Sequence, residues 1–319
     1  MPTLPLDPTD FSKTRPTLQV NWSANSLGTL KTCPQRYMRE KIQGWRRKGN
    51  IHLDFGSKYA EAMDVYQKAR ETADHESALR AVVKHIINLG TRTAEGVWQP
   101  WDTNKEHKDY KLKNRDTLMR AVVWYLEEFK DNHAQTIRLA DGTFASELTF
   151  KFGTTLYAPC GTEYTLHGKL DRLVDFGGDV FVLDNKTTKS TISNHYFKQF
   201  TPNNQITLYT LAGQIVFNAK VKGVIIDAAQ LAVGFARFSR ALIFRTQRSL
   251  DEYLKDLTFW LRAAEQYAEA DHWPMNDTAC DKFGGCPFRE ICAADPGVRD
   301  MYLKTSFERR VVETQEGDD

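Results

Sequence analysis

The stretch "KLDRLVDFGGDVFVLDNKT" (residues 169–187) predicts two apolar-rich strands joined by a tight turn at Gly177-Gly178. Two glycines between alternating apolar residues are typical of the two-residue turn that connects antiparallel strands. In that register Asp171 pairs with Asp184 on one face of the hairpin. Lys186, two residues after Asp184, shares this face because side chains alternate along a strand.

Facing carboxylates repel each other in a sheet, and the repulsion grows as water is excluded. A divalent cation between Asp171 and Asp184 reverses this effect, and Mg²⁺ and Mn²⁺ prefer oxygen ligands. The sequence therefore predicts a metal site at these two residues, with Lys186 beside it. The alternative is an exposed antiparallel face whose charges are solvated.

Composition restricts the class of protein only broadly. The chain has 319 residues, of which 41% are hydrophobic and 26% charged, and its net charge is +2. This is ordinary for a globular protein, and any basic surface has to be local. Without a long apolar run, we expect no membrane partner and a cytoplasmic location with reduced thiols.

The order of the predicted elements indicates a mixed α/β core with a helical N-terminal elaboration. Helical spacing occurs at 56–71, 75–89, 114–132, 203–219 and 249–270, and strand-like patterns occur at 145–152, 222–233 and 235–246. The central order is helix, three strands, helix, strand. We expect four regions, namely an extended arm (1–20), a helical region (21–135), a core (136–272) and a cysteine-containing end (273–319).

The hairpin "GKLDRLVDF…VFVLDNKTT" resembles the catalytic hairpin of the PD-(D/E)xK nuclease superfamily, in its RecB-like exonuclease branch. The resemblance implies that Asp171, Asp184 and Lys186 are the catalytic residues. The segment "NNQITLYTLAG" carries Gln205 and Tyr209, which match the Q-x-x-x-Y motif that lines the DNA path in this branch. An amphipathic helix with a polar edge is the simpler explanation of that pair alone.

Four cysteines are distributed unusually along the chain. Cys280, Cys286 and Cys292 are evenly spaced near the C-terminus, whereas Cys33 lies far upstream in "KTCPQRY". One distant and three clustered cysteines resemble the RecB-like nucleases with a 4Fe-4S cluster, of phage or CRISPR-associated type. The resemblance implies a structural cluster that staples the two ends of the domain. Zinc is the competing interpretation, and Cys160 is expected to be an unligated thiol.

One residue departs from the family pattern. An early helix usually carries F-G-x-x-x-H, whose histidine is a further metal ligand, but "LDFGSKYA" has Ala60 at that position. Three explanations are open: the natural chain has lost the ligand, Glu61 or His52 replaces it, or the alanine is an inactivating substitution. Glu147 falls at a position that is commonly acidic in the family and is either a supporting group or an exposed strand residue.

The segment "VWQPWDTNKEHKDYKLKNR" (97–115) interleaves aromatic and basic residues, as single-stranded nucleic acid-binding segments do. The candidates for DNA contact are Trp98, Trp101, Lys105, Lys108, Tyr110, Lys111, Lys113 and Arg115. The alternative is a solvated loop that two tryptophans anchor to the core.

These features together predict a Mg²⁺- or Mn²⁺-dependent DNA exonuclease that acts on single-stranded DNA or DNA ends. The resemblance implies a role in recombination, repair or phage DNA processing, with a recombination or helicase partner and a host-cell location if phage-encoded. Two other functions remain open: a non-catalytic DNA-binding protein on the same fold, and a zinc-stapled interaction protein.

Overall fold

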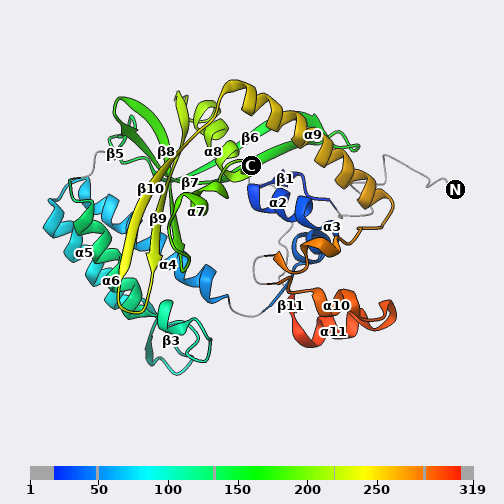
Figure 1. Cartoon of the computed structure of the whole chain (residues 1–319), viewed down its shortest axis with the longest axis horizontal. Helices are drawn as coiled ribbons and strands as arrows, with labels where there is room; N and C mark the ends of the chain where they lie inside the picture. The colour runs from blue at the N-terminus through cyan, green and yellow to red at the C-terminus, as the bar shows by residue number, and fades with distance from the viewer. Residues whose placement is uncertain (1–17, 48–49, 132–133, 219, 283–284, 310–319) are drawn as a thin grey trace. The chain divides into compact units, whose positions relative to one another are not determined.

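The computed structural model describes residues 18–47, 50–131, 134–218, 220–282 and 285–309 (Figure 1). The chain forms two compact units, each built from separated segments. The first unit comprises residues 1–48, 151–168 and 251–319, and the second comprises 49–150 and 169–250. The four linear regions expected from the sequence stay a prediction, and most of the expected arm (1–20) lies outside the described residues.

The second unit is built on a mixed sheet. The strands β7 (Glu163–Phe176), β8 (Asp179–Thr188), β9 (Val221–Leu231) and β10 (Ala236–Phe244) are neighbours in that order, and β7 belongs to this unit from residue 169 on. The β7–β8 and β9–β10 pairs are antiparallel, whereas the central β8–β9 pair is parallel. The short strand β5 (Ala134–Thr136) and the long strand β6 (Ser146–Tyr157) also pair with β7. The predicted mixed α/β class is confirmed.

The β7–β8 hairpin has the predicted turn and register. Gly177 and Gly178 have φ angles of 66° and 84°, in the left-handed region that glycine adopts without a steric cost. The paired residues run from Phe176 with Asp179 to Arg172 with Leu183. The next position in this register brings Asp171 opposite Asp184.

Three helices pack together in the second unit and cover one part of its sheet (Figure 1). They are α4 (Ile51–Arg70), α5 (His75–Asn88) and α6 (Arg115–Glu128). Their buried apolar faces include Phe55, Val82 and Val122 and continue onto Ala229 and Leu231 of β9. This core packs the three helices against β9 and β10 of the sheet.

The helix α8 (Asn204–Ile215) connects the parallel strands β8 and β9. Asn203 caps its start, because the side-chain oxygen of Asn203 accepts hydrogen bonds from the backbone N–H groups of Gln205 and Ile206 at 2.9 and 3.3 Å. A short helix, α7 (Asn194–Lys198), precedes it. The cap therefore fixes Gln205 in the first turn of α8.

The first unit contains the elements nearest the two ends of the chain. The strand β1 (Asn21–Trp22) pairs in parallel with the start of β7. The remaining elements are α2 (Ala24–Thr32), α3 (Pro34–Tyr37), a π-helical turn (Met38–Ile42), β2 (Trp45–Arg46), α9 (Gln247–Glu269), the 3₁₀ turns Asp277–Ala279 and Pro296–Val298, α10 (Arg289–Ala293), α11 (Arg299–Ser306) and β11 (Glu308–Arg309). No helix in the described ranges is long and apolar enough to cross a membrane.

A substitution at Gly223 in β9 would test the close approach of β9 and β10. A Cβ at this position would lie 2.1 Å from the carbonyl oxygen of Ile243. We expect Gly223→Ala to lower the free energy of unfolding by about 1–3 kcal/mol, because backbone atoms cannot move away cheaply. The matched control is Gly56→Ala in α4, where nothing lies within 4 Å of the new Cβ. Urea unfolding should show no loss of stability for the control, and equal stability of both variants would contradict the strand geometry.

Candidate functional site

Asp171 and Asp184 form the centre of a charged site on the β7–β8 hairpin. Asp184 is 2% exposed, and Asp171 is partly buried. The backbone N–H of Asn185 donates to Asp171 Oδ2 at 2.8 Å, which ties this carboxylate to the opposite strand. The two carboxylates are close enough for Asp184 to raise the pKa of Asp171. The hydrogen bond from Asn185 places Asp171 beside the part of β8 that carries Asp184, in agreement with the predicted register.

A chain of polar contacts leads from Asp184 to α8. Lys186 Nζ lies 2.6 Å from Asp184 Oδ2 in an ion pair, and it donates to Gln205 Oε1 at 3.1 Å. Gln205 Nε2 in turn donates to Tyr209 Oη at 3.0 Å. The structure thus brings all five predicted catalytic side chains into one region of the second unit. Asp184 Oδ2 is buried, and Lys186 is the cation that it contacts.

Burial and like charge dominate the electrostatics of the site. Burial, followed by repulsion from Asp184, raises the pKa of Asp171 to about 7, although Lys186 and the Asn185 N–H act in the opposite direction. Burial lowers the pKa of Lys186, but Asp184 and Asp171 outweigh it, so its pKa is raised overall. The site therefore carries negative charge that a single ammonium group only partly compensates.

Glu147 and Asp64 are acidic residues at the margin of the site. Glu147 contributes to the raised pKa of Asp171 and forms an ion pair with Lys169. Its φ of 53° is unusual for a residue other than glycine, as occurs at functional positions. Asp64 on α4 accepts a 3.0 Å hydrogen bond from Ser146 Oγ, next to Glu147. Sequence reasoning missed Asp64, although it lies one helical turn after the unusual Ala60.

Ala60 lies on the same face of α4 as Asp64, because residues four apart share a helix face. The two substitutes considered for the absent histidine have other partners. Glu61 pairs with Lys58 at 2.7 Å and with His85 at 3.2 Å, and His52 lies 3.3 Å from Asp109. In the part of the chain that the structure describes, no group of three His, Cys, Asp or Glu side chains could hold a metal ion.

The aromatic and basic segment 97–115 divides into anchored and exposed side chains. Four candidates for DNA contact have partners within the chain. Trp101 donates to Asp54 at 3.2 Å, Tyr110 to Asp102 at 2.6 Å, Lys113 to Thr187 at 3.3 Å and Arg115 to the carbonyl of Ile86 at 3.3 Å. Lys113 is only 2% exposed and lies over the ring of Phe55.

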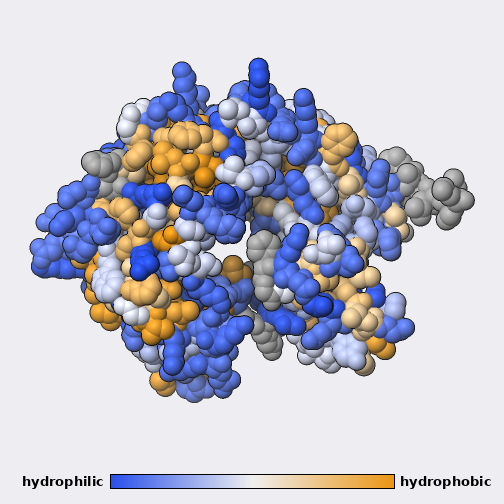
Figure 2. Space-filling view, viewed as in Figure 1, coloured by the Kyte–Doolittle hydropathy of each residue, from blue (hydrophilic) through white to orange (hydrophobic). Residues whose placement is uncertain are grey.

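The other four candidates, Trp98, Lys105, Lys108 and Lys111, are exposed. Trp98 belongs to β4 (Trp98–Pro100), which pairs with β3 (Gly90–Arg92). Figure 2 shows mainly hydrophilic residues over this part of the molecule, which carries the label β3 in Figure 1. Only this exposed subset is available for contact with a phosphate backbone.

Four cysteines line one cavity of about 300 Å³ in the first unit. Cys33 lies between α2 and α3, whereas Cys280, Cys286 and Cys292 lie in or beside the last short helices. Burial raises the pKa of the Cys286 and Cys292 thiols, while nearby Arg36, Arg39 and Arg299 act in the opposite direction. None of the five cysteines, which all lie in the described residues, forms a disulfide bond, and Cys160 is not among those that line the cavity.

The Asp171→Asn variant tests the repulsion between the facing carboxylates. In metal chelator, the ionised Asp171 destabilises the folded state increasingly as the pH rises from about 4 to about 7, because its folded-state pKa is above its unfolded value. We expect Asp171→Asn to stabilise the protein by on the order of 3 kcal/mol at pH 8 and by clearly less at pH 5. The exposed Asp131→Asn variant should have little effect at either pH. Urea unfolding at both pH values measures this, and a gain that does not depend on pH would contradict the assignment.

Comparison with known proteins places the chain in a family. The model of the PD-(D/E)XK nuclease superfamily matches residues 21–293. No curated protein matches the sequence significantly. Among solved structures, a "Putative exonuclease" from Eubacterium rectale is 12% identical with a TM-score of 0.46, over 88% of this chain and 92% of that chain. The protein SSO0001 is 10% identical with a TM-score of 0.29, over 79% of this chain and 82% of its own. On the match across residues 21–293, the chain belongs to the PD-(D/E)XK nuclease superfamily.

Proposed function

We propose that the chain is a metal-dependent DNA exonuclease of the RecB-like branch, with a structural 4Fe-4S cluster. The observation that best supports nuclease activity is the series of polar contacts from Asp184 through Lys186 and Gln205 to Tyr209, with Asp171 facing Asp184. The family supports hydrolysis of nucleic acid. Its restriction to DNA, to free ends and to single strands is part of the proposal.

The two aspartates fit a divalent cation. Asp184 is buried with Lys186 as the cation that it contacts, and burial beside Asp184 makes a negative charge on Asp171 unfavourable, which raises its pKa. Asp171 and Asp184 would hold Mg²⁺ or Mn²⁺, with water completing the coordination because these two aspartates offer few ligands. A bound ion of this kind neutralises a phosphodiester and makes water a better nucleophile.

The remaining side chains position the substrate. Lys186, with an ammonium group that stays protonated at neutral pH, stabilises negative charge on the scissile phosphate. Gln205 connects Lys186 to the Tyr209 hydroxyl, which keeps that ammonium directed toward the aspartates. Tyr209 packs edge-on against Phe150, so its hydroxyl is held on the side of Gln205. The exposed residues Trp98, Lys105, Lys108 and Lys111 are the group that would contact the DNA strand.

The position of four cysteines supports the proposed cluster. Cys33, Cys280, Cys286 and Cys292 line one cavity of about 300 Å³. A 4Fe-4S cluster takes four thiolate ligands. Arg36, Arg39 and Arg299 surround the thiols and would compensate the negative charge of the ligands. The role is structural, because phosphodiester hydrolysis transfers no electrons.

Ala60 favours a second candidate, a non-catalytic DNA-binding protein on the same fold. An alanine supplies no metal ligand, and neither Glu61 nor His52 is free to replace one. Such a protein would bind DNA without cleaving it, together with a recombination or helicase partner. The third candidate, a zinc-stapled interaction protein, is separated from both by its metal content.

Restoring the absent histidine tests the activity. We expect Ala60→His to raise Mn²⁺-dependent cutting at least tenfold, because a third ligand beside the aspartates strengthens metal binding. The measurement is nucleotide release from single-stranded and double-stranded DNA ends. Adding Asp184→Asn to the variant should abolish cutting, while Ser77→His on the exposed start of α5 should change nothing. Absence of cutting by both the parent chain and Ala60→His would favour the non-catalytic protein.

Metal analysis of anaerobically purified protein tests the cluster. We expect about four irons per chain and a brown colour, because four thiolates bind one 4Fe-4S cluster. Cys292→Ser should lose iron and melt at a lower temperature, since the cluster connects α2 and α10. Cys160→Ser, outside the cavity, is the matched control and should keep its iron. A colourless protein that contains zinc and no iron would contradict the proposal.

A further inference from the structure

A polar cavity lies in the second unit, apart from Asp171 and Asp184. Its volume is about 100 Å³, and α4, α6, β5 and β7 contribute its lining. Its cationic residues are Arg70, Lys130 and Arg172, accompanied by the amides of Gln67 and Gln135. Within the described chain, no aspartate or glutamate lines this cavity. Its chemistry is therefore that of an anion site.

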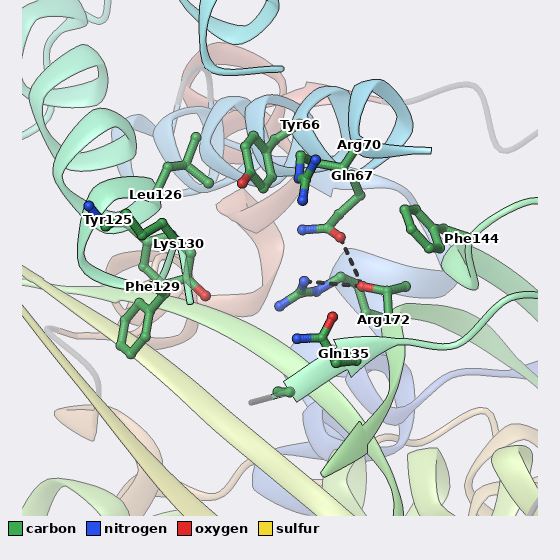
Figure 3. Close-up of a pocket in the computed structure, with 12 residues that line it drawn as sticks. Tyr66, Gln67, Arg70, Tyr125, Leu126, Phe129, Lys130, Gln135, Phe144 and Arg172 are labelled. Atoms are coloured by element: carbon green, nitrogen blue, oxygen red, sulfur yellow. Dashed lines mark hydrogen bonds between the residues drawn. The ribbon is translucent and has the colours of Figure 1, made fainter. Parts of the chain in front are cut away.

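Arg172 is the central residue of this cavity. It is only 5% exposed, yet its Nη2 is buried without a hydrogen-bond partner. Its Nη1 donates to Thr136 Oγ1 at 3.3 Å, and Thr136 Oγ1 donates to Gln67 Oε1 at 2.8 Å. Figure 3 shows the Arg172 side chain between Gln67 and Gln135, with Arg70 beyond Gln67. A buried guanidinium with a free donor is costly unless an anion neutralises it.

Arg240 of the same unit shows what a satisfied buried guanidinium looks like. Its Nη2 lies 2.8 Å from Asp227 Oδ2 and donates to Tyr125 Oη at 2.8 Å. In the described part of the chain, no carboxylate lies within ion-pair distance of Arg172. Asp227, the acidic residue buried nearby, is already paired with Arg240. By contrast, Arg172 Nη2 has no hydrogen-bond partner among the described residues.

Cavity size and donor type restrict the ligand. A volume of about 100 Å³ holds roughly three waters at about 30 Å³ each, which suits one compact oxyanion rather than a whole nucleoside. Arginine forks recognise phosphate through paired N–H donors, and the amides of Gln67 and Gln135 add neutral donors. Arg172 follows Asp171 directly on β7, so alternation directs the two side chains to opposite faces of the sheet. The cavity is thus distinct from the proposed catalytic site.

We propose that this cavity binds a phosphate group, with Arg172 as its main ligand and Arg70 and Lys130 as supporting cations. The group belongs either to inorganic phosphate or to a 5′-mononucleotide whose sugar and base remain outside. Because Arg172 lies on the strand that carries Asp171, the bound anion would neutralise a charge directly behind the aspartate pair.

Isothermal titration calorimetry of the full chain tests this proposal. The titrants are inorganic phosphate and a 5′-mononucleotide, at constant ionic strength, with chelator present so that metal at the aspartates contributes nothing. We expect one phosphate per chain, and at least tenfold weaker binding by Arg172→Gln. The exposed Arg80→Gln variant is the matched control and should bind as the parent does.

Two variants at the rim of the cavity, Arg70→Gln and Lys130→Gln, keep the test decisive if Arg172→Gln fails to fold. Arg70 is partly buried and Lys130 is exposed, so each variant should fold, and each should weaken phosphate binding several-fold. Much tighter binding of the mononucleotide would assign the phosphate to a nucleotide, whereas equal affinity would assign it to the free ion. No binding of either titrant by the parent chain would overturn the proposal, as would rim variants that bind as tightly as the parent. Neither result depends on nuclease activity.

Discussion

The repulsion between Asp171 and Asp184 is the constraint around which the second unit is organised. The hairpin register brings the two carboxylates together, and burial raises the pKa of Asp171 to about 7. One ammonium, from Lys186, compensates part of that charge, and its position depends on Gln205 and hence on the capped start of α8. The hairpin and the crossover helix α8 thus hold together a group of side chains with excess negative charge. Such a group would favour a bound cation.

The sequence predicted this part well because its signals are local. Two glycines fixed the turn, and strict alternation then determined which charged residues share a face. Gln205 and Tyr209 followed from helical spacing and remain four apart on α8. The order of helices and strands was equally accessible, because apolar periodicity over ten or more residues is a strong signal.

Features that depend on distant segments were not predictable. The aromatic and basic pattern at 97–115 does not reveal that Lys113 is buried over Phe55 or that Arg115 bonds to the end of α5. A DNA-contacting segment and a loop anchored to the core would have the same sequence pattern. Only the tertiary packing shows which side chains are anchored and which are exposed. Asp64 and Arg172 were missed for the same reason, since each acquires its meaning from residues on other elements.

Asp171 and Arg172 are neighbours on β7 and have charges of opposite sign, so burial of Asp171 favours a nearby cation and burial of Arg172 a nearby anion. Alternation turns the carboxylate to one face and the guanidinium to the other. Lys186 compensates the charge of Asp171 only in part, and Arg172 Nη2 has no hydrogen-bond partner among the described residues. A buried charged group with a purely structural role would have a partner of opposite charge within the chain, as Asp227 has in Arg240. Asp171 and Arg172 have none of comparable strength among the described residues. We therefore propose that small ions of opposite sign stabilise the two faces of the same strand.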